Sequence, residues 1–193
     1  MYNSFMRDLL EALGSSQART RLRASKALRE LSRRDPAALY PHFGVFAGLL
    51  GHPNSIIRWN AILTLGNLAV ADDQGKLECL LDRYLAPIRG PVMITAANTI
   101  QGAASIALAH PHLADRIATQ ILGVETAKYA TAECRNVAIG HALEALSKIR
   151  ALLSHPAKVV AFASRQVGNP RPATARKAAR LLAAMPAKRR AVP

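Results

Sequence analysis

Apolar residues recur along most of the chain at the three- and four-residue spacing of an amphipathic helix. Short breaks rich in Gly, Pro, Ser and Asn separate these periodic runs, and no run is evidently a strand. The runs form five pairs, which are 3–14 with 18–33, 37–50 with 54–70, 73–86 with 91–109, 112–123 with 131–152, and 156–167 with 172–185. The pattern therefore predicts an all-α chain of about five helix pairs.

The second helix of most pairs opens with the same step, an arginine followed three residues later by an alanine. The four copies are Arg21 to Ala24, Arg58 to Ala61, Arg135 to Ala138, and Arg176 to Ala179. An apolar residue follows each alanine by four positions, and in the remaining pair Met93 replaces the arginine before Ala96. A repeat of about 39 residues indicates a solenoid, in which neighbouring helix pairs bury each other's apolar faces.

The segments IIRWNAILTLGNLA, RTRLRASKALREL and ATARKAARLLAAM carry a resemblance to the HEAT-repeat family over essentially the whole chain. The resemblance implies a right-handed α-α superhelix, a HEAT-like solenoid, over 1–185, followed by a short basic tail at 186–193. It also implies that the second helices line a concave surface. Family members often place an acid in the turn beside the repeat arginine. Here the turns offer Gln17, Asn54 and Asn169, so we expect a weaker ladder or one made by amide oxygens.

If each repeat alanine points into the stack, the opposite side of each second helix faces the concave surface. On the second helix of the first pair, that side is basic and carries Arg19, Lys26, Arg29 and Arg33. On the last, Lys177 lies opposite Ala179 with Arg180 at its edge. These six residues are the candidate anion- or nucleic-acid-binding set.

The same rotation places an apolar group, Ile56, Trp59, Leu63 and Val70, on the concave side of the second pair. The third pair offers Ile94, Asn98, Gln101 and Ser105, and the fourth Glu133, Gly140, Glu144 and Ser147. Trp59, the only tryptophan, is either a recognition anchor or a packing residue covered by a neighbouring unit or a sister chain. The amide strip is either a hydrogen-bonding face or ordinary solvated surface. The candidate partner-binding set is Trp59, Leu63, Asn98, Gln101 and Ser105.

The net charge of +14 is concentrated at the two ends of the chain. Residues 145–193 contain eleven Lys or Arg and no acid, and residues 15–34 contain seven basic residues against Glu30 alone. This asymmetry favours an anionic partner. The alternative is that the charge keeps the two end repeats polar on their outer surfaces, as a solenoid requires.

Catalytic and metal-binding patterns are not evident. The only close histidine pair is His110-Pro-His112, and we expect it to supply polar groups to a turn rather than to bind a metal. Cys79 and Cys134 are expected to be plain buried thiols in a reducing cytoplasm. The chain resembles HEAT-like alkylpurine DNA glycosylases in architecture and charge only, since no acid shares the exposed face near Trp59. Interrupted apolar windows and the acidic start of the chain argue against a membrane span and a signal peptide.

These observations predict a non-enzymatic HEAT-repeat interaction module that binds a protein or peptide along its concave face. The alternative is a nucleic-acid-binding protein that uses the basic patches. We expect no cofactor, no metal, no membrane partner and no small-molecule ligand, and a cytoplasmic location.

Overall fold

The computed structural model describes residues 2–185, so the predicted basic tail at 186–193 lies outside the described residues. Within this range every regular element is helical. The α-helices are α1 (Tyr2–Ala12), α2 (Ala18–Arg34), α3 (Pro36–Leu39), α4 (Phe43–Gly48), α5 (Ser55–Leu68), α6 (Lys76–Leu85), α7 (Met93–Ala109), α8 (Ala114–Leu122), α9 (Ala132–Ile149), α10 (Ala157–Gln166) and α11 (Pro172–Ala184). Short 3-10 helices extend or join them at Tyr40–His42, Leu49–Gly51, Ala69–Ala71, Ala86–Arg89, Pro111–Leu113, Gly123–Glu125 and Arg150–Leu152.

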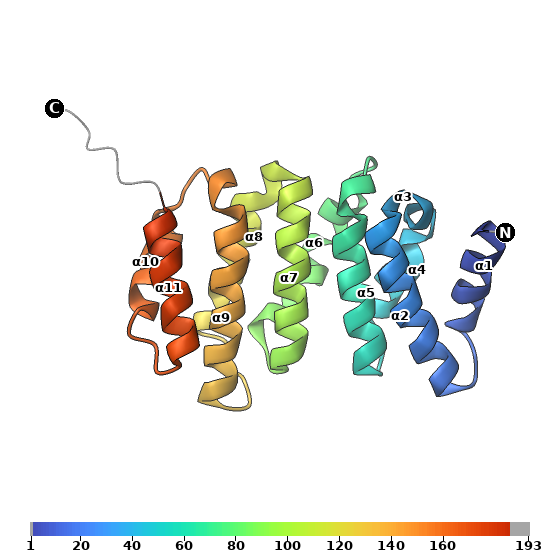
Figure 1. Ribbon diagram of the computed structural model, residues 1–193, viewed down its shortest axis with the longest axis horizontal. Coiled ribbons are helices and arrows are strands. Elements are labelled where there is room, and N and C mark those ends of the chain that lie inside the picture. Colours follow the sequence, from blue (N-terminus) through green and yellow to red (C-terminus); the bar gives the residue numbers. More distant parts are fainter. Residues whose placement is uncertain (1, 186–193) are drawn as a thin grey trace.

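The helices form two layers that run in chain order from one end of the molecule to the other (Figure 1). The second helices α2, α5, α7, α9 and α11 lie side by side in one layer, and each contacts the next. The first helices α3 with α4, α6, α8 and α10 lie in the layer behind, and α1 lies beside α2 at the N-terminal end of the array. This arrangement confirms the predicted all-α, solenoid-like fold of helix pairs.

Neighbouring second helices run parallel, and polar side chains join them at matching heights. Asn60 Nδ2 donates to Ser25 Oγ, and two turns further on Asn67 Nδ2 donates to Ser32 Oγ, both at 2.9 Å. Because the residue numbers of both partners increase from one bond to the next, α2 and α5 are parallel. Most of these polar atoms are buried, so the bonds satisfy groups that would otherwise cost free energy in the core.

The buried core lies between the two layers and extends through all the repeats. Its largest fully buried side chains include Leu28, Leu65, Tyr84, Ile100 and Phe162. Each helix pair alone could cover only part of its apolar surface, so each unit depends on its neighbours for burial.

The buried position common to the second helices is the seventh residue after each N-cap. The five residues at this position are Ala24, Ala61, Thr99, Ala138 and Ala178, and all are buried. The predicted Ala179 is instead exposed, as is Ala183. The Arg-x-x-Ala step misled the prediction there, because Arg176 lies one residue beyond the repeat position.

The first helix of the second pair was predicted as one run over 37–50, but it is broken. It comprises α3, the 3-10 turn Tyr40–His42, and α4. Pro41 lies in the break, where its missing N–H and its ring disfavour a continuous α-helix.

Two of the four repeat arginines bind main-chain carbonyl groups of the preceding turn, so at these two positions amide side chains do not replace the acid. Arg21 Nη1 donates to Ser15 O at 2.6 Å, and Arg58 Nη1 donates to His52 O at 3.0 Å. Asn54 instead caps α5, where its Oδ1 accepts from Ile56 N and Ile57 N.

Two further observations concern the predicted environment of the chain. Cys79 is exposed and Cys134 is partly buried, so the prediction of buried thiols is wrong for Cys79. No helix within residues 2–185 is both long and apolar enough to cross a bilayer.

Candidate interaction surface

The exposed side of the second-helix layer, here called the second-helix face, is organised in rows. Each row comprises the second, ninth and sixteenth residues after an N-cap, which lie about two helical turns apart. The α2 row is Arg19, Lys26 and Arg33, and the α7 row is Ile94, Gln101 and Leu108. The α5 row is Ile56, Leu63 and Val70, the last of which lies in the 3-10 turn that extends α5. All nine side chains are exposed except Leu63, which is half-buried.

The α2 row is basic and only partly neutralised. Glu30 accepts from Arg29 Nη2 at 2.8 Å and from Arg33 Nη1 at 3.3 Å, and the bond from Arg29 lowers the pKa of Glu30. Arg19 and Lys26 have no acidic partner among residues 2–185. Arg23, which the sequence prediction missed, is exposed four residues after Arg19.

Arg29 differs from the other predicted cations. It is half-buried and its guanidinium is held by Glu30, so its charge is less available than that of Lys26.

The α5 and α7 rows expose large apolar side chains at the centre of the molecule. Ile56 is 49% exposed, Val70 72%, Ile94 47% and Leu108 52%. Both helices are apolar on almost every side, a composition typical of helices that are covered all round. An apolar strip of this kind on a central surface marks an interaction site more often than isolated apolar residues do.

Trp59 lies in the seam between α5 and α7. Its side chain is half-buried, and the indole Nε1 donates to Thr95 Oγ1 of the neighbouring helix at 2.9 Å. The ring is therefore held in place by α7 while part of it still contacts solvent. The bond to Thr95 supports the packing interpretation of Trp59, and its role as a recognition anchor stays a prediction.

The residues of the predicted amide strip on α7 differ in how accessible they are to a partner. Gln101 is exposed, whereas Asn98 Nδ2 donates to Ile94 O of its own helix at 3.0 Å and Ser105 is half-buried. Gln101 is thus the member of this strip best placed to meet a partner.

The α9–α11 end of the face carries two ion pairs. Lys177 Nζ lies 3.2 Å from Glu144 Oε2, and Arg171 pairs with Glu133. The predicted cation Lys177 is therefore half-buried and paired, while Arg180 is exposed with no acidic partner among the described residues. Burial, followed by the charge of Lys177, lowers the pKa of His141 beside this pair.

Acids on the first-helix layer mostly join one repeat to the next. Glu78 lies 3.2 Å from His112, Asp82 lies 2.7 Å from Arg116, and Glu125 accepts two bonds from Arg165 at 2.8 and 2.7 Å. In the acid-free C-terminal quarter, Arg165, Arg171 and Lys177 form ion pairs with acidic residues of the preceding repeat. These ion pairs involve three of the eleven basic residues that the sequence analysis counted in 145–193.

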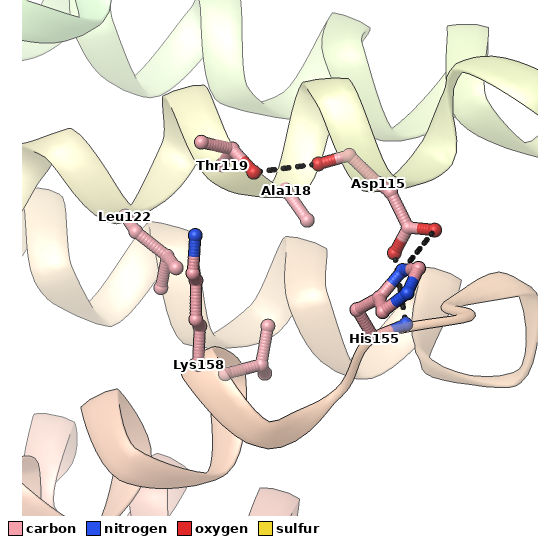
Figure 2. A pocket seen from close by; sticks show the side chains of 7 residues that line it. Asp115, Ala118, Thr119, Leu122, His155 and Lys158 are labelled. Carbon is pink, nitrogen blue, oxygen red and sulfur yellow. Dashed lines mark hydrogen bonds and ion pairs between the residues drawn. The ribbon is translucent and has the colours of Figure 1, made fainter.

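A cavity of about 270 Å³ lies between α8 and α10, away from the second-helix face (Figure 2). Its carboxylate, Asp115, accepts from the main-chain N of Ser154 at 3.2 Å and of His155 at 3.3 Å. Burial opposes ionisation of Asp115, but these bonds outweigh it and lower the pKa. Asp115 Oδ2 also lies 3.6 Å from His155 Nδ1, so this carboxylate holds both the main chain and the side chain of the turn before α10.

The His110-Pro-His112 segment lies at a repeat junction, as its turn character predicted. His110 Nε2 is 3.9 Å from Asp72 Oδ2, and Asp72 Oδ1 accepts from the Tyr40 hydroxyl at 2.5 Å. Within residues 2–185 no group of three or more His, Cys, Asp or Glu side chains is arranged to hold a metal ion.

Comparison with known proteins supports the fold alone. No family model matches the chain, and no curated protein matches it. A solved structure, the crystal structure of an engineered protein from the Northeast Structural Genomics Consortium, is similar with a TM-score of 0.59 and 17% identity. The match covers 92% of this chain and 78% of that chain. The chain is thus similar in fold to an engineered protein, and membership of the HEAT-repeat family stays a prediction.

Proposed function

We propose that the protein is a non-enzymatic interaction module of the HEAT-repeat kind, which holds a protein or peptide segment on its second-helix face. The observation that carries the proposal is the exposed apolar strip on α5 and α7. Ile56, Val70, Ile94 and Leu108 remain accessible at the centre of the array, where a stable solenoid has no internal reason to expose them.

The residues of the face suit recognition more than chemistry. Apolar side chains supply contact area, Trp59 supplies a rigid ring held by Thr95, and Gln101 supplies an amide that can donate and accept. A partner on this face would lie between the unpaired cations of α2 and the ion pairs that join α9 to α11.

The test is site-specific photo-crosslinking. A photoreactive amino acid placed at Leu63 or Gln101 should capture a partner, while the same group at Thr119 on the first-helix layer should not. The captured protein is then purified and its affinity measured for the wild type and for Leu63→Asp. We expect the substitution to weaken binding at least tenfold. Equal capture from both layers, or equal affinity for both forms, would reject this face as the binding site.

Nucleic acid is the second candidate, favoured by the unpaired cations Arg19, Arg23 and Lys26. Such binding would weaken with salt, with the logarithmic slope steepening by about 0.9 for each duplex phosphate neutralised. Binding of duplex DNA that disappears in Lys26→Glu, but survives in Arg83→Glu on α6, would favour this candidate. DNA binding that is absent at low salt would remove it.

A further inference from the structure

We propose that the second-helix face binds an acidic amphipathic helix of a protein partner, lying along the α5–α7 seam with its carboxylates toward α2. This inference rests on the proposed function and adds the chemistry, length and orientation of the segment. It is carried by the juxtaposition of a basic row and an apolar strip of equal length on parallel helices.

The geometry sets the length and direction of the bound segment. Ile94 and Leu108 lie fourteen residues apart on α7, which corresponds to about 21 Å at 1.5 Å per residue. Ile56 and Val70 have the same separation in sequence, with Val70 in the 3-10 turn Ala69–Ala71 that follows α5. A partner helix of about four turns therefore matches the strip. Anchors at i, i+3 or i+4, and i+7 on the partner would meet side chains that recur every seven residues on the face.

The α2 row runs beside this strip over the same length, from Arg19 to Arg33. Arg19 and Lys26 lack an acidic partner among the described residues, so an acidic flank on the bound helix would meet uncompensated positive charge. Arg23 does not contribute, because it lines a cavity between α1 and α2 with Phe5 and Leu9. Long basic side chains can also cover apolar surface with their methylene groups while their charges stay in water.

The opposite side of the strip sets the orientation. There the bound helix would face Gln101 and then α9, where Glu144 is exposed and shares its charge with Lys177 and His141. An acidic flank placed on that side would meet a carboxylate rather than free cations. The two sides thus differ in charge, and a helix with acids on one flank fits with that flank toward α2.

The test is selection from a displayed library of random peptides of about 16 residues, slightly longer than the strip. We use four forms of the full chain, namely the wild type, Leu63→Asp, the double variant Arg19→Glu with Lys26→Glu, and the control Arg83→Glu. Arg83 is an exposed cation on the first-helix layer, so its reversal changes the net charge without changing the face. Circular dichroism of each variant confirms that it is folded.

The expected result is enrichment of amphipathic peptides with an acidic excess on the wild type and on Arg83→Glu. The double variant should lose this acidic preference, and affinity for the wild-type peptides should fall at least tenfold. Enrichment that depends on Leu63 but shows no acidic excess would overturn the inference and leave the proposed function standing. Absence of any Leu63-dependent enrichment would overturn both. A preference of the wild type for basic peptides would also overturn the inference.

Discussion

Two glycines set the distance between the central second helices. A Cβ on Gly66 would lie 2.7 Å from Gly102 Cα, and a Cβ on Gly102 would overlap the Tyr84 hydroxyl. That hydroxyl is fully buried and donates to Ile62 O at 2.9 Å. Small residues at this crossing therefore permit close packing and also leave room for a buried hydrogen bond.

We predict that Gly102→Ala lowers the free energy of unfolding by about 1–3 kcal/mol, because the added methyl group overpacks the α5–α7 crossing and displaces Tyr84. The matched control is Gly44→Ala on α4, where nothing lies within 4 Å of the new Cβ. Replacing a helical glycine there should be neutral or stabilising by up to about 1 kcal/mol. Urea unfolding measures both, and equal midpoints for the two variants would contradict the packing argument.

Tyr40 gives a prediction for alkaline pH. Burial, followed by its bond to Asp72, raises the pKa of Tyr40 to about 12, above the ordinary value near 10. Since the folded-state pKa exceeds the unfolded one, this stability is present below pH 10 and is lost as the pH rises from 10 to 12. Burial of Tyr129, whose pKa is also about 12, acts in the same direction.

We therefore expect Tyr40→Phe to be less stable than the wild type at pH 7, because Asp72 loses a donor. Its free energy of unfolding should also fall less between pH 9 and pH 11. Urea titrations at both pH values measure the difference. Parallel pH dependences in the two proteins would show that Tyr40 does not carry this linkage.

At the scale of the helices, side-chain hydrogen bonds and ion pairs join neighbouring repeats, and those of Glu125 with α10 are an example. Glu125 accepts from Arg165 twice and from Gln166 Nε2 at 2.9 Å, and the Arg165 bond lowers its pKa against an opposing effect of burial. A lowered carboxyl pKa stabilises the fold above the unfolded value near 4.3, and this stability is lost as the pH falls through the folded value.

We predict that Glu125→Gln lowers the urea midpoint at pH 7 and that the difference from the wild type shrinks as the pH falls below the unfolded value near 4.3. The control is Glu11→Gln on α1, whose distance to Arg7 is 3.9 Å and whose side chain is largely exposed. It should leave the midpoint unchanged over the same pH range. A Glu125→Gln difference that persists at acid pH would indicate lost packing instead of a lost ion pair.

The elements themselves were largely predictable, because periodic apolar runs and Gly, Pro and Asn breaks act locally. The errors in helix continuity and register arose where a proline or an N-cap position determined the structure. Pro41 broke a run that apolar periodicity alone made continuous, and the last helix took its register from its start at Pro172 rather than from Arg176. Numbering each second helix from its N-cap would have identified Ala178 as the buried position of α11 and would have given the exposed rows of the second-helix face.

The candidate site was predictable in part. Rotation about each helix identified the side that carries Lys26, Leu63 and Gln101, since exposure follows from the helical period. It could not find the pairing of Lys177 with Glu144 or the bond from Trp59 to Thr95, which join residues from different repeats. Such contacts depend on how neighbouring helices are offset, and the offset is not readable from one helix alone.

At the scale of the whole molecule, the linear order of the repeats determines how stability is distributed. Each second helix contacts mainly the next one, so an interior unit is supported on two sides and the last unit on one. Local opening should therefore be easiest at the ends and hardest near α5 and α7.

We predict that Leu181→Ala in α11 speeds amide hydrogen exchange chiefly in α10 and α11, whereas Ile100→Ala in α7 speeds exchange from α5 through α9. Both side chains are almost fully buried, and each truncation should cost about 2–5 kcal/mol. Hydrogen-exchange mass spectrometry resolves the affected segments. Uniform acceleration across residues 2–185 in both variants would show that the array unfolds as a single unit.

The central claim is that the exposed apolar strip on α5 and α7 is the binding surface, and the fluorescence of Trp59 tests it most directly. As the only tryptophan, it reports on the α5–α7 seam alone. Acrylamide quenching is measured while a selected acidic peptide without tryptophan is titrated into the wild type. The account predicts that quenching falls and saturates with binding, and that Leu63→Asp abolishes the change while Arg83→Glu preserves it. Peptide binding that leaves the quenching of Trp59 unchanged would contradict the account and place the binding surface elsewhere on the molecule.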